Sequence, residues 1–160
     1  MMGADNPQER LDKKWIVGFV DGEGCFHVAI NQQHKMTIGW QVLPELRVVQ
    51  HKRDRQVLER MRKTLNVGVV RVNNKDRLEL RVRKLSELNY IVTFFEKHPL
   101  MTTKHQNFIL FKKIILAMNE KKHLTRDGLT EIAKIAAKMN RKVRSRYLES
   151  SETIRQTRST

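Results

Sequence analysis

The spacing of apolar side chains near the start of the chain changes at one point from the spacing of a helix to that of a strand. Over residues 9–20 the apolar positions follow one face of an α-helix, and from Gly24 the period is two. The helical set is Leu11, Trp15, Ile16, Phe19 and Val20, and the strand set is Phe26, Val28 and Ile30. We therefore predict a helix that ends near residues 21–24, where two glycines favour termination, and continues directly into a half-buried strand.

The rest of the chain repeats both kinds of pattern. The predicted elements are strands around residues 41–48, 70–72 and 78–82 and helices over residues 54–65, 86–95, 104–118 and about 126–139. Pro44 lies within the second strand and favours an edge position or a bulge. Residues 73–76 form the turn between the third and fourth strands, which predicts a hairpin. The fold class is α+β with an antiparallel sheet.

Positive charge gives the first indication of a partner. The chain has 32 Lys and Arg against 17 Asp and Glu, a formal net charge of +15, which attracts a polyanion. We expect the partner to be nucleic acid. Binding to a membrane surface is a weaker alternative, and so is a solvated basic surface that binds no ligand. Residues 140–160 are basic and have few apolar side chains, so we predict one domain over 1–139 and a basic tail that is flexible or ordered only on DNA.

Other features of the sequence exclude several classes of protein. No stretch reaches the roughly 18 apolar residues that span a bilayer, and no signal peptide is present, so we expect a soluble protein of the cytoplasm, nucleoid or organelle matrix. The only cysteine, Cys25, cannot form an intrachain disulfide. No Cys/His cluster has the spacing of a zinc site, so the apolar core has to stabilise the fold.

The end of the first helix combines glycine spacing with an acidic residue. Gly18 and Gly22 are four residues apart and share one side of the helix, where a second backbone can approach closely. If two such helices met there, the Glu23 carboxylates would approach each other near the negative ends of both helix dipoles, and a divalent cation would relieve the repulsion. The alternatives are that the glycines only release the helix end and that Glu23 is a solvated acid.

The segment Trp15–Gly24, which reads WIVGFVDGEG, resembles the signature of LAGLIDADG homing endonucleases. The order of helices and strands also matches that family up to about Met118. The resemblance implies the αββαββα fold of the family, with an antiparallel DNA-binding sheet and additional C-terminal helices. It implies an enzyme that hydrolyses both strands of double-stranded DNA at a long, partly palindromic target. With one copy of the motif it also implies a homodimer, with Gly18 and Gly22 at the interface.

The resemblance further implies a metal-dependent active site. Glu23 corresponds to the metal ligand, assisted by the backbone carbonyl of Gly22. The expected cation is Mg²⁺, with Mn²⁺ as another choice and Ca²⁺ as a non-catalytic substitute. The other site residues that it implies are Gln50, which orders water, Lys104 and a basic residue for which both Arg53 and Arg55 are possible, with Arg55 preferred.

The face of the sheet opposite the apolar side chains is predicted to read DNA. Arg pairs with guanine, Asn and Gln with adenine, and Glu with cytosine in the major groove. The predicted DNA-binding residues are His27, Asn31, Gln41, Glu45, Arg47, Arg71, Asn73, Arg77, Glu79, Arg81 and Arg83.

Two other functions explain part of the sequence. A DNA-binding regulator or an RNA-splicing maturase of the same fold would keep the surface without cutting, whereas Glu23, Gln50 and Lys104 together favour the enzyme. A basic ribosomal or RNA-packaging protein would explain the charge but not the glycine-spaced helix with an acidic end. The sequence is compatible with a gene in an intron or in an intein.

Overall fold

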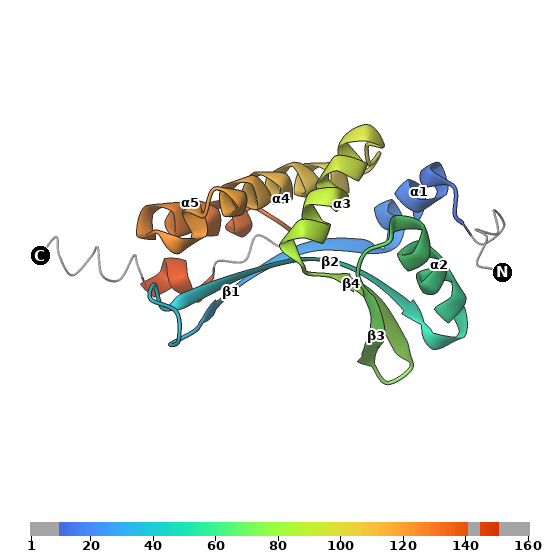
Figure 1. Cartoon of the computed structure of the whole chain (residues 1–160), viewed down its shortest axis with the longest axis horizontal. Helices are drawn as coiled ribbons and strands as arrows, with labels where there is room; N and C mark the ends of the chain where they lie inside the picture. Colours follow the sequence, from blue (N-terminus) through green and yellow to red (C-terminus); the bar gives the residue numbers. More distant parts are fainter. Residues whose placement is uncertain (1–9, 141–144, 151–160) are drawn as a thin grey trace, which may run out of the picture. The chain divides into compact units, whose positions relative to one another are not determined.

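A computed structural model describes residues 10–140 and 145–150 of the chain. Its helices and strands are shown in Figure 1 and confirm the predicted α+β class. They are α1 (Lys13–Glu23), β1 (Gly24–Gln32), β2 (Trp40–His51), η1 (Lys52–Asp54), α2 (Arg55–Leu65), β3 (Val69–Asn74), β4 (Arg77–Val82), α3 (Leu85–Lys97), α4 (Lys104–Asn119), η2 (Lys122–Leu124) and α5 (Arg126–Ala137). Among the described residues, no helix is both long enough and apolar enough to cross a membrane.

The chain forms two compact units from interleaved segments. The first unit contains the residues up to Phe26 and the segment Glu45–His105. The second contains His27–Pro44 and the residues from Gln106 onward. The long strands β1 and β2 each contribute residues to both units. The prediction of one domain over residues 1–139 therefore stays a prediction.

Helix α1 has a defined start and a defined end. The Asp12 carboxylate caps its first turn by accepting hydrogen bonds from the backbone N–H groups of Lys14 at 2.8 Å and Trp15 at 3.4 Å. The helix ends at Glu23 and β1 begins at the next residue, as the change of period predicts. A Cβ atom on Gly24 would lie 2.9 Å from the carbonyl oxygen of Val20, so the sharp change from helix to strand requires glycine at this position.

The apolar face predicted for α1 is only partly correct. Ile16 and Val20 are buried as expected, together with Val17. The side chain of Trp15, in contrast, is 43% exposed and stacks on Phe19 with 4.8 Å between the ring centroids. The first helix therefore has one apolar side in the core and a second, aromatic side at the surface.

The strands form one antiparallel sheet in the order β1-β2-β4-β3. Strand β2 is central in this order, whereas Pro44 favoured an edge position or a bulge. The antiparallel pairing of β2 with β4 extends from Leu46 opposite Val82 to His51 opposite Arg77. Pro44 comes before this paired stretch, so its missing N–H group removes no hydrogen bond from that ladder.

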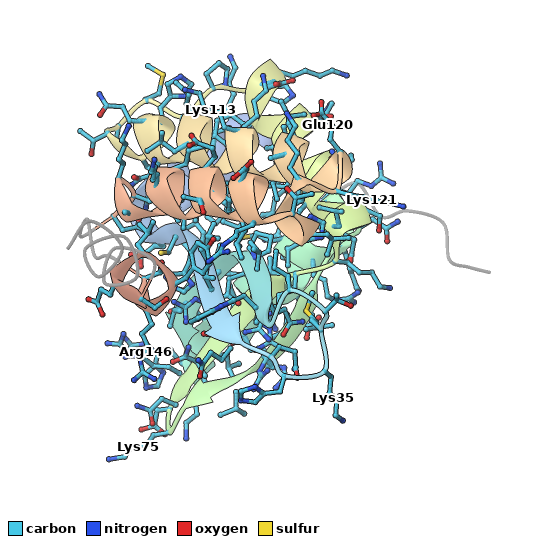
Figure 2. All side chains as sticks on the ribbon, turned by 90° about the vertical axis from the view of Figure 1, so that its left-hand side faces the viewer. Lys35, Lys75, Lys113, Glu120, Lys121 and Arg146 are labelled. Atoms are coloured by element: carbon cyan, nitrogen blue, oxygen red, sulfur yellow. The ribbon has the colours of Figure 1, made fainter. Side chains whose placement is uncertain are left out.

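Strands β3 and β4 form the predicted hairpin. Lys75 adopts a left-handed conformation with φ of 47° in the turn, and its side chain points away from the tip of the hairpin in Figure 2. Leu78, Leu80 and Val82 are buried as predicted. Val72 is not, because β3 is an edge strand with mostly exposed side chains, and 59% of Val72 is accessible to solvent.

The core of the first unit joins the helices to the apolar face of the strands. Phe26 at the start of β1 meets Phe95 of α3 in an edge-to-face contact with 5.8 Å between the ring centroids. Leu58 and Met61 of α2 are fully buried. The helices and strands of this unit therefore share one apolar core, which fixes the end of α1 relative to the strand ends.

The second unit includes part of the predicted tail. Tyr147 and Leu148 are buried in a helical turn over residues 146–150. The Tyr147 hydroxyl is 2.6 Å from the hydroxyl of Thr130 on α5, and its ring packs edge-to-face against Trp40. The expectation that the chain beyond Met139 has little to bury is therefore wrong for this turn. Other tail residues of the prediction, at positions 141–144 and 151–160, lie outside the described residues.

Candidate functional site

The side chain of Lys104 binds the C-terminal end of α1. Its Nζ donates hydrogen bonds to the backbone carbonyl oxygens of Val20 and Asp21, each at 3.0 Å. These carbonyls belong to the last turn of the helix, which carries the negative end of the helix dipole, and that of Val20 also accepts the backbone N–H of Gly24. The ammonium group therefore stabilises the end of the helix from which Glu23 projects, and the catalytic role of Lys104 stays a prediction.

Asp21, in the last turn of α1, accepts hydrogen bonds from the segment that precedes α4. Asp21 accepts hydrogen bonds from the backbone N–H groups of Met101 at 2.7 Å and Thr102 at 3.2 Å, and from the Thr102 hydroxyl at 2.7 Å. Burial alone would raise the pKa of Asp21, but these hydrogen bonds and the charge of Lys104 outweigh it and hold the pKa below its usual value. Asp21 thus holds the segment that leads into α4, and this segment carries Lys104.

Glu23 is exposed and, among the described residues, forms no hydrogen bond or ion pair. The carbonyl of Gly22 belongs to the same last helical turn, beyond the two carbonyls that Lys104 binds. The described residues contain no cluster of three or more His, Cys, Asp or Glu side chains that could hold a metal alone. One carboxylate and one carbonyl suit Mg²⁺, which keeps several waters and takes further ligands from substrate phosphates.

The strand ends bring the other predicted site residues to the same end of the sheet. Strands β1 and β2 are neighbours joined by residues 33–39, so the start of β1 and the end of β2 lie together. Gln50 is half-buried near the end of β2, opposite Leu78 of β4. It therefore lies at the end of the sheet where Glu23 leaves α1.

Arg53 and Arg55 follow in the connection to α2, and both remain candidates for the basic residue. The side chain of Arg53 is 78% exposed, with its Nε 3.9 Å from the neighbouring Asp54 carboxylate. Arg55 is the first residue of α2 and forms an ion pair of 3.7 Å with Glu59 on the next helical turn. Our preference for Arg55 stays a prediction.

The outer side of α1 is open. Gly18 and Gly22 are both exposed, and a Cβ atom built on either would have no neighbour within 4 Å. Gly18 therefore has no packing reason within the described residues to be glycine, although a mid-helix glycine costs about 1 kcal/mol relative to alanine. The stacked rings of Trp15 and Phe19 lie at helical spacing from these glycines. The surface is thus open to a second helix, and the packing of another helix at Gly18 and Gly22 stays a prediction.

Arginines dominate the polar face of the sheet in the first unit. Arg47 of β2 lies opposite Arg81 of β4, and both are half-buried, whereas Arg71 and Arg83 are exposed. Burial and the charges of Arg83 and Arg71 lower the pKa of Arg81, against the opposing effect of the acidic neighbours. Asn73 and Arg77 are exposed at the end of the hairpin. These six side chains lie on the face predicted to read DNA.

The expectation that Glu45 and Glu79 are displayed on that face is wrong. Both are only 4% exposed, because arginine side chains cover them. Glu45 pairs with Arg47 at 3.0 Å and Arg83 at 2.7 Å, in each case through Nε. Glu79 accepts a hydrogen bond from Asn73 at 3.0 Å and lies 3.6 Å from Nε of Arg71. A buried, paired carboxylate does not present itself to cytosine as the sequence pattern predicts.

The remaining predicted DNA-binding residues belong to the second unit. Asn31 is exposed, and His27 and Gln41 are half-buried. Asn31 lines a hollow of about 580 Å³ together with Trp40 and Arg146. Arg146 is labelled in Figure 2. Arg146 lies in the tail predicted to be flexible or ordered only on DNA, whereas Tyr147, which follows it, is anchored on α5.

Sequence reasoning missed the role of Asp21 and the positions of two other residues. His51 accepts a hydrogen bond from the backbone N–H of Arg53 at 3.1 Å and so shapes the start of η1. Thr102 accepts a hydrogen bond from the N–H of Lys104 at 3.2 Å, which is the role of a cap residue at the start of α4. The threonines before a predicted helix were a usable signal for that cap, but no local pattern connects Thr102 with Asp21.

Comparison with known proteins decides the family. Residues 16–115 match the model of the family described as LAGLIDADG endonuclease. The chain belongs to this family. The match begins within α1 and ends within α4, so it contains Glu23, Gln50 and Lys104.

Relatives of known structure share the fold. The crystal structure of the homing endonuclease I-TnaI is 50% identical in sequence, covers 91% of this chain and 99% of its own, and superposes with a TM-score of 0.85. The LAGLIDADG homing endonuclease I-SmaMI, in a crystal structure with cleaved DNA, is 29% identical over 90% of this chain and 49% of its own, with a TM-score of 0.86.

A curated relative is also similar in sequence. It is the probable intron-encoded endonuclease 2 of Neurospora crassa, which is 35% identical over 81% of this chain. This chain spans only 29% of the length of the Neurospora protein.

Replacing Asp21 by Ala is expected to lower the free energy of unfolding by about 1 kcal/mol, as for other lost helix caps, because Met101 and Thr102 lose their common acceptor. Denaturant unfolding at neutral pH measures this change. Asp76→Ala is the control, since Asp76 forms an exposed ion pair with Lys52 and should change stability by at most about 0.5 kcal/mol. Equal effects of the two substitutions would contradict the role of Asp21.

Proposed function

We propose that the protein is a sequence-specific endonuclease that hydrolyses both strands of double-stranded DNA at a long, partly palindromic target. The observation that carries the proposal is the end of α1, where an exposed, unpaired carboxylate projects from a helix terminus held by Lys104 and Asp21. A DNA-binding protein without catalysis has no need for such a group at a helix end. The family match and the cleaved DNA in the I-SmaMI structure support the proposal.

The proposed active site contains Glu23 and the carbonyl of Gly22 as metal ligands. Mg²⁺ or Mn²⁺ bound there would polarise the scissile phosphate and lower the pKa of the attacking water, whereas Ca²⁺ would bind without supporting cleavage. Gln50 would orient that water. Lys104 and Arg55, or Arg53 in its place, would stabilise the charge that develops on the phosphate. Lys104 additionally keeps the helix end in place through its two carbonyl contacts.

The proposed assembly is a homodimer formed through the outer side of α1. Exposed glycines allow two helix backbones to approach closely, and Trp15 and Phe19 would bury apolar surface beside them. The sequence matches 49% of the I-SmaMI chain but nearly all of the I-TnaI chain, which supports one copy of the fold within this sequence. Two copies around a twofold axis would bring two Glu23 carboxylates together and read two related half-sites.

Glu23→Gln is expected to lower the rate of cleavage by roughly a thousandfold or more, because it removes the ligand charge that a metal contributing several kcal/mol requires. Binding of the target in Ca²⁺ should change by no more than a few-fold, since the side chain keeps its shape. The substrate is the duplex selected from a randomised library by cleavage with Mg²⁺. Glu120→Gln, an exposed acid at the end of α4, is the control. Full cleavage by Glu23→Gln would refute the active-site assignment.

Gly18→Leu is expected to weaken the dimer by about 10- to 100-fold, because the added side chain separates the two helices. The subunit itself accommodates the change, since the space next to Gly18 is open. Sedimentation equilibrium gives the dissociation constant, and unfolding measurements confirm that each subunit is folded. Thr93→Leu, which adds the same side chain to an exposed position of α3, should leave the dimer intact. An unchanged dimer in Gly18→Leu would show that the interface lies elsewhere.

A further inference from the structure

Two carboxylates are buried on the arginine-rich face of the sheet, where a protein that binds a polyanion gains nothing from negative charge. Glu45 and Glu79 are each 4% exposed, and each is on the strand face opposite the apolar core. Burying an ionised carboxylate is unfavourable unless cations and hydrogen-bond donors surround it. Here the surrounding groups are the arginines expected to contact DNA.

The sheet register forms a separate group around each carboxylate. One residue beyond the paired Leu46 and Val82, Glu45 meets Arg83 across the strands, and Arg47 approaches it from the same strand. Around the second carboxylate, Arg71 of β3 lies directly opposite Glu79 of β4. Arg81 follows Glu79 by two residues on the same face, with its Nη1 4.0 Å from the carboxylate. Glu45 therefore has Arg47 and Arg83, and Glu79 has Arg71 and Arg81.

The chemistry of these groups leaves the arginines able to bind DNA. A guanidinium has five N–H donors in a planar fork, and a carboxylate has about four acceptor sites. One glutamate can thus satisfy only about four of the ten donors on its two arginines. The hydrogen bond that Arg83 donates through Nε to Glu45, at 2.7 Å, fixes the plane of that guanidinium while its other donors remain for a base edge. Arg47 lies at ion-pair distance from the same carboxylate, 3.0 Å through Nε, so its charge is held there without that hydrogen bond.

We propose that Glu45 and Glu79 are positioning residues for sequence recognition, each holding two arginines in the orientation that reads particular base pairs. The proposal rests on the proposed DNA-binding function and assigns neither glutamate a contact with a base. Free arginines would lose side-chain entropy on binding and would also find phosphates, which carry no sequence information. A held guanidinium has already lost that freedom, so correct base pairs are favoured over phosphate contacts. A purely structural role would instead be to relieve repulsion between facing arginines such as Arg47 and Arg81.

The test compares base preference in full-length variants with that of the unaltered protein. The probe is the duplex selected by the unaltered protein from a randomised library, with all its single-base variants and one unrelated duplex, in Ca²⁺ to prevent cleavage. Arg47→Ala, Arg83→Ala, Arg71→Ala and Arg81→Ala first identify the base pairs that each arginine reads. Glu45→Gln should then lower preference about tenfold at the base pairs read by Arg47 and Arg83, and Glu79→Gln at those read by Arg71 and Arg81.

Two further substitutions separate positioning from charge and from stability. Glu131→Gln makes the same charge change on an exposed residue of α5 and should leave base preference unchanged. Glu79→Asp keeps the charge but shortens the reach to Arg71 and Asn73, and it should reproduce the positional effect of Glu79→Gln without altering the salt dependence of binding. If either Gln variant does not fold, the corresponding Asp variant decides the question. Melting temperatures are measured for every variant.

The outcomes are distinct. Loss of preference confined to the base pairs of the paired arginines supports the proposal. Unchanged preference in folded Gln variants, with or without a lower melting temperature, overturns it and leaves only a structural role. An equal loss of base preference at all positions also overturns it. A loss of preference at base pairs that no paired arginine reads overturns it too, because the glutamates would then read bases themselves. Failure of the unaltered protein to select any sequence would instead refute the proposed function.

Discussion

The contact on which the candidate site depends is the pair of hydrogen bonds from Lys104 to the last turn of α1. A helix that ends in an exposed acid concentrates negative charge from its own dipole and from the side chain. The ammonium group offsets that charge at Val20 and Asp21, while Asp21 holds the segment that carries Lys104. The two interactions support each other, and together they leave Glu23 as the acidic group of this helix end directed away from the protein.

On the sheet the charges are arranged in the opposite way, with buried acids next to arginines. Four arginines on adjacent strands repel one another, and burial lowers the pKa of Arg81. Glu45 and Glu79 offset this repulsion from within the face. At the helix end a half-buried cation lies among acceptors, next to an exposed acid. On the sheet, two acids are buried among arginines, which are the groups that we propose contact DNA.

The sequence predicts the local features of the fold well, because these depend on neighbouring residues. The change from α1 to β1 at Gly24, the helix that begins at Lys104 and the β3–β4 hairpin are confirmed. Features that depend on distant segments were missed or misjudged. Pro44 favoured an edge position or a bulge, but β2 is central in the order of the sheet. Alternation alone predicted exposure of Glu45 and Glu79, whose burial depends on arginines of the same and of neighbouring strands. The position of Lys104 came from the family resemblance, since no local pattern links it to a helix more than 80 residues earlier.

Incubation of the protein with a randomised DNA library and Mg²⁺, followed by sequencing of the cleaved ends, tests the central claim most directly. The account predicts breaks in both strands at one long sequence with partial twofold symmetry, because two copies of α1 would present two acids and two copies of the sheet would read related half-sites. Binding without cleavage, cleavage without sequence preference, or a preferred site lacking any twofold symmetry would contradict it.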